Sequence, residues 1–416
     1  MNILFVHQNF PGQFKHLAPA LARLGHKVTA LKIAPGSSTT WNDVLITPYQ
    51  LGRGNGKDTH PLARDLESKV IRAEACFHTA KKLRDTGYYP DIIIAHPGWG
   101  ETLFLKEIWP DSLIKIYCEF YYHVEGYDVG FDPEFPTTDI QRIQIRLKNI
   151  NNSMQFGLAH SALSPTKWQA STYPKWFRDK ITVVHDGIDT EVACPNAEAT
   201  VKLPNGKRID KNSEVVTFVN RSLEPYRGFH TFMRALPLIL ASRPHAEVVV
   251  IGGEGVSYGA KPPYGNSWKD VLLEEVKEQV NARDWNRVHF VGNVPYNEFL
   301  ATLQVSTVHV YLTYPFVLSW SLLEAMSVGC AIVASDTAPV RELITHESEG
   351  ILRDFFDFEG LAQSVSNLMD AKELRVSMGE RARKKIINQY DLNSICLPLQ
   401  IDWALTSETH DANYSR

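Results

Sequence analysis

The sequence lacks any long hydrophobic run. No apolar segment approaches the roughly 18 residues of a membrane-spanning helix, so no span is expected. The opening residues, MNILFV, carry no basic region and soon give way to polar residues, which favours a first β-strand over a secretion signal. Peripheral contact with a membrane surface stays open.

Cysteine is scarce, and a strong charge of one sign is absent. The five cysteines are scattered and form no CxxC pair. Such a set is typical of a reduced compartment, so we expect a cytoplasmic protein. The formal net charge of −4 argues against general nucleic-acid binding. The oligomeric state is left open by these features.

A dinucleotide-binding fingerprint is also absent. The run Gly252-Gly253-Glu254-Gly255 follows a predicted strand but is too short for GxGxxG. An NAD-dependent dehydrogenase is therefore poorly supported, and no cofactor is predicted.

The residues that are present alternate between short apolar runs and segments of helical periodicity. Strands are predicted at 2–6, 27–33, 91–95, 113–120, 181–184, 215–219, 247–251, 288–291, 308–312 and 331–334. Helical spacing separates many of them, as at Leu17, Leu21 and Leu24. This alternation predicts parallel sheets covered by helices, and the 416 residues predict two such doubly wound, Rossmann-like α/β domains.

A polar stretch divides the two halves of the chain. It contains two prolines and an Asn-Gly pair, so we predict a linker or loop over 191–214. The linker would separate one domain over 1–190 from a second domain over 215–390. A helix at about 391–406 is placed back against the first domain, and the polar tail from Ser407 is expected to be disordered. Ligands are expected in a cleft between the domains, beyond the carboxyl ends of the strands.

Two loops of the second half carry groups suited to a nucleotide. Arg221 follows a predicted strand, and Arg227 precedes a predicted helix. Two arginines beside a helix N-terminus favour a diphosphate, because the hydrogen bonds and the helix dipole both attract negative charge. Glu324, on the helix after loop 315–319, could accept hydrogen bonds from both hydroxyls of a ribose. Each of these residues has a plain alternative as a solvated surface side chain.

Together, these pieces resemble the C-terminal domain of the GT-B glycosyltransferases of family 4, a retaining group. The matching segments are HDGID at 185–189, NRSLEPYRGF at 220–229, VVVIGGEG at 248–255, VHFVGNV at 288–294 and SLLEAMSVGCAIVAS at 321–335. The resemblance implies a GT-B fold and a nucleoside-diphosphate sugar donor, with UDP favoured. It also implies transfer of a hexose-type sugar, with retention of configuration, to a hydroxyl of a sugar, lipid-linked or small-molecule acceptor.

The resemblance implies that the domain over 1–190 is the acceptor-side domain and that the domain over 215–390 binds the nucleotide-sugar. It also implies roles for particular residues. Arg221 and Arg227 match the basic pair that grips the donor diphosphate, and Glu324 matches the second Glu of the family's E-x7-E motif, which binds the ribose. Further donor contacts are implied near the base at Asn293 and Val294, near the phosphates at Gly12, and around the sugar at Phe316, Val317, Leu318 and Ser319. Gly12 has an equal alternative as an ordinary turn glycine.

One departure from the family pattern affects the sugar site. Phe316 stands where the first motif Glu is expected, and Ser319 stands where a Gly is usual. The missing carboxylate keeps open a non-catalytic GT-B partner subunit. A nucleotide-sugar epimerase or hydrolase of the same fold is the other alternative.

The first half supplies the remaining catalytic and acceptor candidates. Glu119 stands about where family relatives place a His, and His123 follows four residues later. Either could orient the sugar or the acceptor hydroxyl, and with Arg221 and Arg227 they complete the predicted catalytic set. The acceptor-side candidates are Asn9, Gln13, His16, Gly98, Tyr121 and Tyr122, with residues 37–60 as a polar loop beside them. A structural role is the alternative for His123 and both tyrosines.

No metal site is predicted. The sequence contains no Asp-x-Asp triplet, which metal-dependent glycosyltransferases of the other common fold use to hold a divalent cation. Arginines and a helix N-terminus would replace the metal in stabilising the departing diphosphate.

Overall fold

The computed structural model describes residues 1–406 and divides the chain into two compact units. Of the described residues, the first unit holds Met1–Asp186 and those from Asn393 to Thr406, and the second holds Gly187–Leu392. The predicted disordered tail from Ser407 lies outside the described residues.

Within residues 1–406, the first unit is built on an eight-stranded sheet in the order β3-β4-β2-β1-β5-β6-β7-β8. Its strands are β1 (Asn2–Val6), β2 (Lys27–Ile33), β3 (Thr39–Trp41), β4 (Val44–Tyr49), β5 (Ile92–Ala95), β6 (Leu113–Tyr117), β7 (Ala159–Ser164) and β8 (Ile181–Val183). The pairings are parallel except that β3 runs antiparallel to β4. The predicted polar loop over 37–60 therefore contains two strands, β3 and β4, whereas its residues 50–60 form neither strand nor helix.

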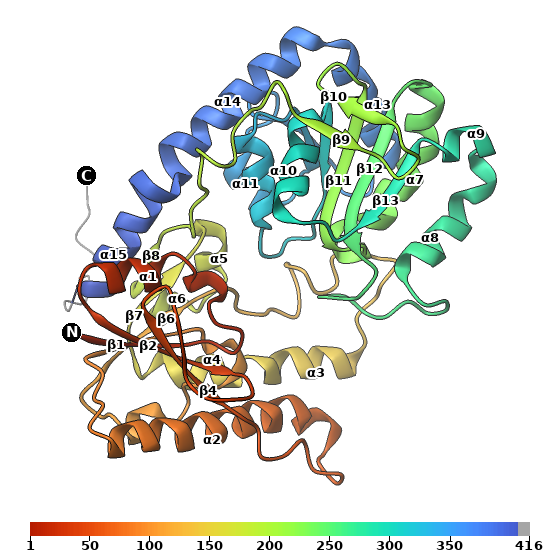
Figure 1. The fold of residues 1–416 in the computed structure, drawn as a ribbon. Coiled ribbons are helices and arrows are strands. Elements are labelled where there is room, and N and C mark those ends of the chain that lie inside the picture. Colours follow the sequence, from red (N-terminus) through yellow and green to blue (C-terminus); the bar gives the residue numbers. More distant parts are fainter. Residues whose placement is uncertain (407–416) are drawn as a thin grey trace. The chain divides into compact units, whose positions relative to one another are not determined.

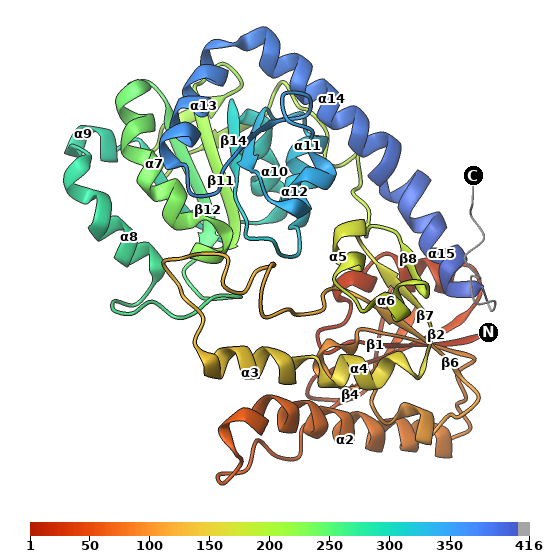
Figure 2. The same cartoon turned by 180° about the vertical axis from the view of Figure 1, so that it is seen from behind.

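Helices cover both faces of this sheet (Figures 1 and 2). They are α1 (Leu17–Arg23), α2 (Arg64–Asp85), α4 (Ile150–Phe156), α5 (Lys167–Ser171), α6 (Lys175–Arg178) and α15 (Leu397–Leu405). A further helix, α3 (Asp139–Lys148), has no buried side chain and packs beside α2 and α4. Successive side chains of β1 point to opposite faces. Leu4 and Val6 pack in the cluster that includes α2 and α4, whereas Ile3 and Phe5 pack with α1 and α15.

The last described helix, α15, completes the core of the first unit. Trp403 is 3% exposed and packs in the cluster that contains Leu17 of α1. The buried Lys115 of β6 donates hydrogen bonds from Nζ to the carbonyl oxygens of Trp403 and Thr406, where a cation complements the helix dipole. Burial lowers the pKa of Lys115 to about 8.

The second unit contains a parallel sheet in the order β13-β12-β11-β14-β15-β16 and a separate hairpin of β9 and β10. The strands are β9 (Thr200–Lys202), β10 (Arg208–Asp210), β11 (Val215–Ser222), β12 (Glu247–Gly253), β13 (Val288–Gly292), β14 (Val308–Tyr311), β15 (Ile332–Ser335) and β16 (Ile351–Arg353). The prediction of a linker over 191–214 is wrong. This stretch forms the hairpin, and its buried Leu203 and Ile209 join the core of the second unit.

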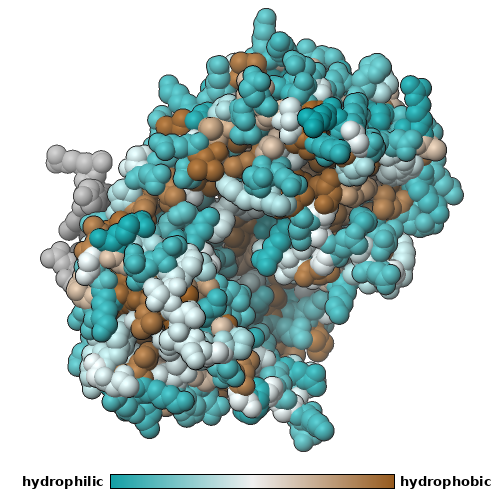
Figure 3. Space-filling view, viewed as in Figure 1, coloured by the Kyte–Doolittle hydropathy of each residue, from teal (hydrophilic) through white to brown (hydrophobic). Residues whose placement is uncertain are grey.

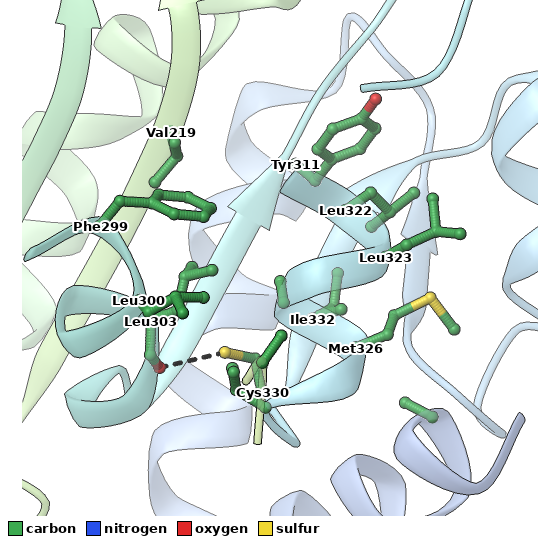
Figure 4. Close-up of a cluster of buried hydrophobic side chains, with 14 of the residues drawn as sticks. Val219, Phe299, Leu300, Leu303, Tyr311, Leu322, Leu323, Met326, Cys330 and Ile332 are labelled. Atoms are coloured by element: carbon green, nitrogen blue, oxygen red, sulfur yellow. Dashed lines mark hydrogen bonds between the residues drawn. The ribbon is translucent and has the colours of Figure 1, made fainter. Parts of the chain in front are cut away.

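Helices also cover both faces of the second sheet. They are α7 (Phe229–Ser242), α8 (Trp268–Val276), α9 (Ala282–Trp285), α10 (Tyr296–Val305), α11 (Trp320–Ser327), α12 (Ala338–Leu343), α13 (Phe358–Asp370) and α14 (Lys372–Tyr390). On one face, Val219 of β11 packs with side chains of α10 and α11 (Figure 4). On the other, Phe218 stacks on Phe232 of α7 with ring centroids 4.4 Å apart. The predicted pair of doubly wound, Rossmann-like α/β domains is confirmed.

Figure 3 shows mostly hydrophilic residues on the face of Figure 1, with hydrophobic ones in smaller patches. Among residues 1–406, no helix combines the length and the apolar character that crossing a membrane requires.

The packing of α15 predicts that Trp403→Ala destabilises the first unit by about 3–5 kcal/mol, because it leaves a cavity in the core. The matched control is Leu399→Ala on the same helix, where the side chain is 49% exposed, so a change within about 0.5 kcal/mol is expected. Urea unfolding monitored by circular dichroism gives both values. Equal effects of the two substitutions would contradict the assignment of α15 to the core.

Candidate functional site

Three adjacent strands of the first sheet end in loops that bring a carboxylate and two imidazoles together. His7 follows β1, His96 follows β5, and Glu119 lies just beyond the end of β6. Gln13 donates from Nε2 to Glu119 Oε1 at 3.0 Å, and His96 Nε2 lies 3.5 Å from Glu119 Oε2. The parallel topology explains this gathering, because the carboxyl ends of neighbouring parallel strands share one edge.

Backbone amides hold each imidazole in one tautomer. The Asn9 N–H donates to His7 Nδ1 at 3.0 Å, so the His7 proton is on Nε2, from which it is donated to Gln13 Oε1 at 2.9 Å. The Gly98 N–H likewise donates to His96 Nδ1 at 3.2 Å, which directs the His96 Nε2–H toward the carboxylate. Asn9, Gln13 and Gly98, predicted on the acceptor side, therefore all contribute to one network.

The charges in this network favour an ionised Glu119 beside a neutral His7. Burial, assisted by the neighbouring His96, lowers the pKa of His7 to about 3. Burial alone would raise the pKa of Glu119, but His96, His7 and the hydrogen bond from Gln13 outweigh it and lower that pKa below its ordinary value. A carboxylate held in this way can accept a hydrogen bond from a substrate hydroxyl.

Gly12 has a specific steric reason to be glycine. Its φ is +47°, and a Cβ atom there would lie 2.4 Å from Cε1 of His7. Gly12 therefore lets the loop after β1 pack closely on the His7 ring. This contact favours a structural role over the predicted phosphate contact, which stays a prediction.

His123 lies in a different environment from Glu119. Its Nε2 is 2.7 Å from the carbonyl oxygen of Thr172, and its ring stacks on Tyr127 with centroids 4.2 Å apart. Both contacts belong to an aromatic patch of the first unit, so a structural role is the one that its placement favours.

The other acceptor-side candidates of the first unit also make structural contacts. Tyr121 packs against the core cluster of α2 and α4. The Tyr122 ring lies under Lys148, with Nζ 3.8 Å from its centroid. His16 borders the N-terminus of α1, where its carbonyl oxygen accepts from the Ala20 N–H.

In the second unit, Arg227 is buried at the carboxyl end of β11. The side chain is 5% exposed and lies in the short 3-10 helix Pro225–Arg227 that leads into α7. Its Nη1 donates to Thr313 Oγ1 and to the carbonyl oxygen of Val317, both at 2.8 Å. The Nε and Nη2 groups make no hydrogen bond to any residue of the described chain. The hydrogen bonds of Nη1 thus fix one side of the guanidinium, and on the other the N–H groups of Nε and Nη2 are donors that the described chain leaves unused.

Phe316 is part of the wall around this guanidinium. It is 5% exposed, and its ring centroid lies 5.7 Å from Arg227 Cζ and 5.1 Å from the ring of Tyr226. At the position of the family's first motif Glu, this chain therefore has a phenyl ring that belongs to a buried aromatic cluster.

The loop after Phe316 uses part of its backbone internally. The Ser319 N–H donates to the Tyr311 hydroxyl at 3.0 Å, and Leu318 is buried in the core cluster. Figure 4 shows this tyrosine at the rim of that cluster. Val317 contributes its carbonyl oxygen to Arg227. The Ser319 amide is therefore occupied in this structure, whereas a sugar contact had been predicted for it.

Arg221 and the predicted base contacts are more open. Arg221 is exposed in β11. Asn293 is exposed. A Cβ atom at Gly253 would lie 3.0 Å from Asn293 Nδ2 and 3.3 Å from the carbonyl oxygen of Arg221, so Gly253 lies between these two residues. Val294 packs against the core of the second unit.

Glu324 lies on α11 with a phenol beside its carboxylate. Tyr296, which is 51% exposed, donates its hydroxyl to Glu324 Oε1 at 2.8 Å. Burial and this carboxylate raise the pKa of Tyr296. The contact shows that Glu324 can accept a hydrogen bond from a hydroxyl, which is the function predicted for it toward a ribose.

Sequence reasoning missed several residues around Glu119, Arg227 and Glu324. They are His7 and His96 beside Glu119, Tyr296 beside Glu324, Tyr258, whose ring lies 4.9 Å from Arg227 Cζ, and Glu224, which accepts from the Tyr258 N–H. His7 and His96 directly follow predicted strands, so their position was the available signal. The other three had no local signal, because their partners are distant in the sequence.

A separate cavity of about 600 Å³ lies in the first unit beside α2. Its lining includes Tyr49, Arg53, Glu74, His78 and Lys82. None of the predicted site residues lines it.

Comparison with known proteins identifies both halves of the chain. The model of the glycosyl transferase family 4 group matches residues 24–193, and the model of glycosyl transferases group 1 matches residues 201–385. A D-inositol 3-phosphate glycosyltransferase of Corynebacterium glutamicum is 23% identical over 207 residues, 49% of this chain and 47% of the relative. An uncharacterised glycosyltransferase of Methanocaldococcus jannaschii is 29% identical over 51% of this chain and 49% of the relative. The chain spans about half the length of the curated relatives it matches.

Solved structures share the fold over nearly the whole chain. A sucrose-phosphate synthase of Thermosynechococcus elongatus has a TM-score of 0.75 at 15% identity and covers 97% of this chain and 98% of its own. Anabaena HepE in complex with UDP-glucose has a TM-score of 0.65 at 14% identity, covering 98% and 100%. These likenesses confirm the predicted GT-B fold.

The burial of His7 predicts a loss of stability on acidification. Its pKa is about 3 in the folded state and about 6.5 in an unfolded chain. The unfolded state therefore binds the extra proton between these values. The contribution of His7 is complete above about pH 6.5 and falls by about 1.4 kcal/mol per pH unit as the pH drops toward 3.

The check is urea unfolding of wild type and His7→Gln at pH 6.5 and 4.5. We expect the wild type to lose about 2–3 kcal/mol more than the variant across this interval. Comparing the loss in wild type with the loss in the variant cancels the contribution of other buried histidines, such as His185, because both proteins contain them. Equal losses would contradict a neutral, buried His7.

Proposed function

The chain belongs to the glycosyltransferases of family 4, and from this we propose that it transfers a hexose-type sugar from a nucleoside-diphosphate sugar to an acceptor hydroxyl. A UDP-sugar is the favoured donor. We assign the nucleotide to the second unit and the acceptor to the first. The absence of any CxxC pair among its cysteines supports a cytoplasmic location for this reaction.

The observation that carries the proposal is the placement of Arg227. Its guanidinium is buried, held through Nη1 and flanked by aromatic rings, while its remaining donors are unused within the described chain. It directly precedes Gly228 and the N-terminus of α7. A fixed guanidinium beside a helix N-terminus suits a diphosphate, because both supply hydrogen-bond donors and positive potential.

Glu324 supports the assignment of the nucleotide to the same unit. A ribose would present two hydroxyls to a carboxylate that already accepts one from Tyr296. A bound ribose hydroxyl would replace the Tyr296 hydroxyl as donor to Glu324 or donate in addition to it. The desolvation of Glu324 would cost little, because this side chain is partly exposed.

Glu119 supports a role for the first unit in orienting a hydroxyl. Its carboxylate is kept ionised by His96 and Gln13, so it can accept a hydrogen bond from a hydroxyl of the acceptor or of the transferred sugar. Relatives named as glycosyltransferases of inositol 3-phosphate and of phosphatidyl-myo-inositol support an acceptor rich in hydroxyls. The acceptor class remains a sugar, a lipid-linked sugar or a small molecule.

The proposed reaction proceeds with retention of configuration and without a metal ion. The acceptor hydroxyl attacks the anomeric carbon from the face that the diphosphate leaves, and a phosphate oxygen takes the acceptor proton. The bond from the anomeric carbon to the phosphate oxygen breaks as the new glycosidic bond forms. Arg221 and Arg227 stabilise the charge that develops on the diphosphate.

Glu324→Ala is expected to weaken nucleoside-diphosphate binding by about tenfold or more, because hydrogen bonds to a charged acceptor contribute about 1.5–3 kcal/mol each. A thermal-shift screen with UDP-, GDP- and ADP-sugars first identifies the nucleotide. Calorimetry then compares wild type with Glu324→Ala and with Glu298→Ala, an exposed glutamate on α10. Unchanged affinity in Glu324→Ala would refute the ribose contact.

Nucleotide binding and transfer are both expected to survive exhaustive treatment with EDTA, since arginines supply the positive charge. The affinity for UDP, measured by calorimetry in EDTA and in Mn²⁺, should agree within about twofold. Loss of binding in EDTA that Mn²⁺ restores would reject the metal-free reaction.

A further inference from the structure

Glu224 is a buried carboxylate that is satisfied by backbone amides. It has no exposed surface and forms no ion pair within residues 1–406. Its Oε1 accepts from the N–H groups of Ser257 and Tyr258, both at 3.2 Å, and its Oε2 accepts from Gly259 at 2.9 Å. Burying a charge is costly unless hydrogen bonds replace its water, so these amides determine where the carboxylate can lie.

The same contacts attach the loop after β12 to the end of β11. The Ser222 and Ser257 hydroxyls are 2.8 Å apart, beside the carboxylate. A Cβ atom at Gly259 would lie 3.3 Å from Glu224 Oε2, so the loop can approach this closely because the residue is glycine. Two strands that are neighbours in the sheet are thereby joined beyond their hydrogen-bonded ends.

This attachment brings Tyr258 to Arg227. The Tyr258 ring centroid is 4.9 Å from Arg227 Cζ and 5.1 Å from the ring of Phe316, which also flanks the guanidinium. Hydrogen bonds through Nη1 fix one edge of the guanidinium, and the two rings restrict its plane. The amide of Tyr258 is itself bound by Glu224, so the carboxylate controls the position of the ring.

We propose that Glu224 is a positioning residue for the donor diphosphate. It fixes residues 257–259, which hold Tyr258 against Arg227, and so orders the unused guanidinium donors before the ligand arrives. Pre-ordering raises affinity because less side-chain entropy is lost on binding. This inference rests on the proposed function, and it goes further by assigning a role to a residue that does not touch the ligand.

The experiment uses calorimetry with UDP and UMP on the full chain. The variants are Glu224→Gln, Tyr258→Leu and their combination, with Glu278→Gln as a matched control at an exposed site of the same unit. We expect the ratio of UDP to UMP affinity to fall about tenfold in each single variant, as for loss of one charge-assisted hydrogen bond. The double variant should lose no more than the stronger single one, because both act through one ring. Glu224→Asp, which retains the charge, should recover part of the loss.

A second readout follows the backbone itself. Hydrogen exchange at the amides of Ser257, Tyr258 and Gly259 should accelerate in Glu224→Gln, while exchange in the core strand β11 stays unchanged. Faster exchange with an unchanged UDP-to-UMP ratio would overturn the positioning role, and unchanged exchange would overturn the anchoring step. An equal fall in UDP and UMP affinity would also overturn the proposal, since that pattern reports general destabilisation.

The two proposals fail in different ways. If the wild-type protein binds neither UDP nor UMP, the proposed donor is wrong, and the exchange measurement alone decides whether Glu224 anchors the loop. If UDP binds and Arg227→Ala abolishes the difference between UDP and UMP while Glu224→Gln preserves it, the proposed function stands and the positioning role falls.

Discussion

The buried guanidinium of Arg227, which has no carboxylate partner within residues 1–406, shapes the carboxyl edge of the second sheet. A buried guanidinium needs hydrogen-bond acceptors and polarisable surface around it, and here Thr313, the Val317 carbonyl oxygen and two aromatic rings supply them. This requirement links the ends of β11, β12 and β14, whose loops supply those groups. Phe316 fits the same requirement. Its ring completes the aromatic surroundings of the guanidinium, at a position where the family pattern has a glutamate.

The fold could be predicted largely from hydrophobic patterning, because each buried parallel strand reads as a short apolar run. The failures have physical causes. Residues 191–214 look like a linker, yet Leu203, which directly follows β9, and Ile209 of β10 are buried in the core of the second unit. The predicted strand 113–120 ends at Tyr117, since Glu119 turns away to meet His96.

The site was less predictable than the fold. Arg221, Arg227 and Glu324 could be proposed as candidates because each is a charged residue near the carboxyl end of a predicted strand or on the helix that follows one. His7 and Glu224 acquire their importance from partners that only the folded chain supplies, such as Gln13 and the amides of 257–259. The role of a buried polar group depends on the groups that form hydrogen bonds with it. Patterns in a single sequence carry little information about which residues form these pairs.

The docking of α15 has a consequence for biosynthesis. The core around α1 remains open until Trp403 arrives, and the ribosome must first make the whole second unit. The second unit is continuous and can fold as it emerges, whereas the first, although translated earlier, must wait with apolar surface uncovered. In this chain the N-terminal unit is thus the last to be completed, and holdase chaperones would have most to bind during that interval.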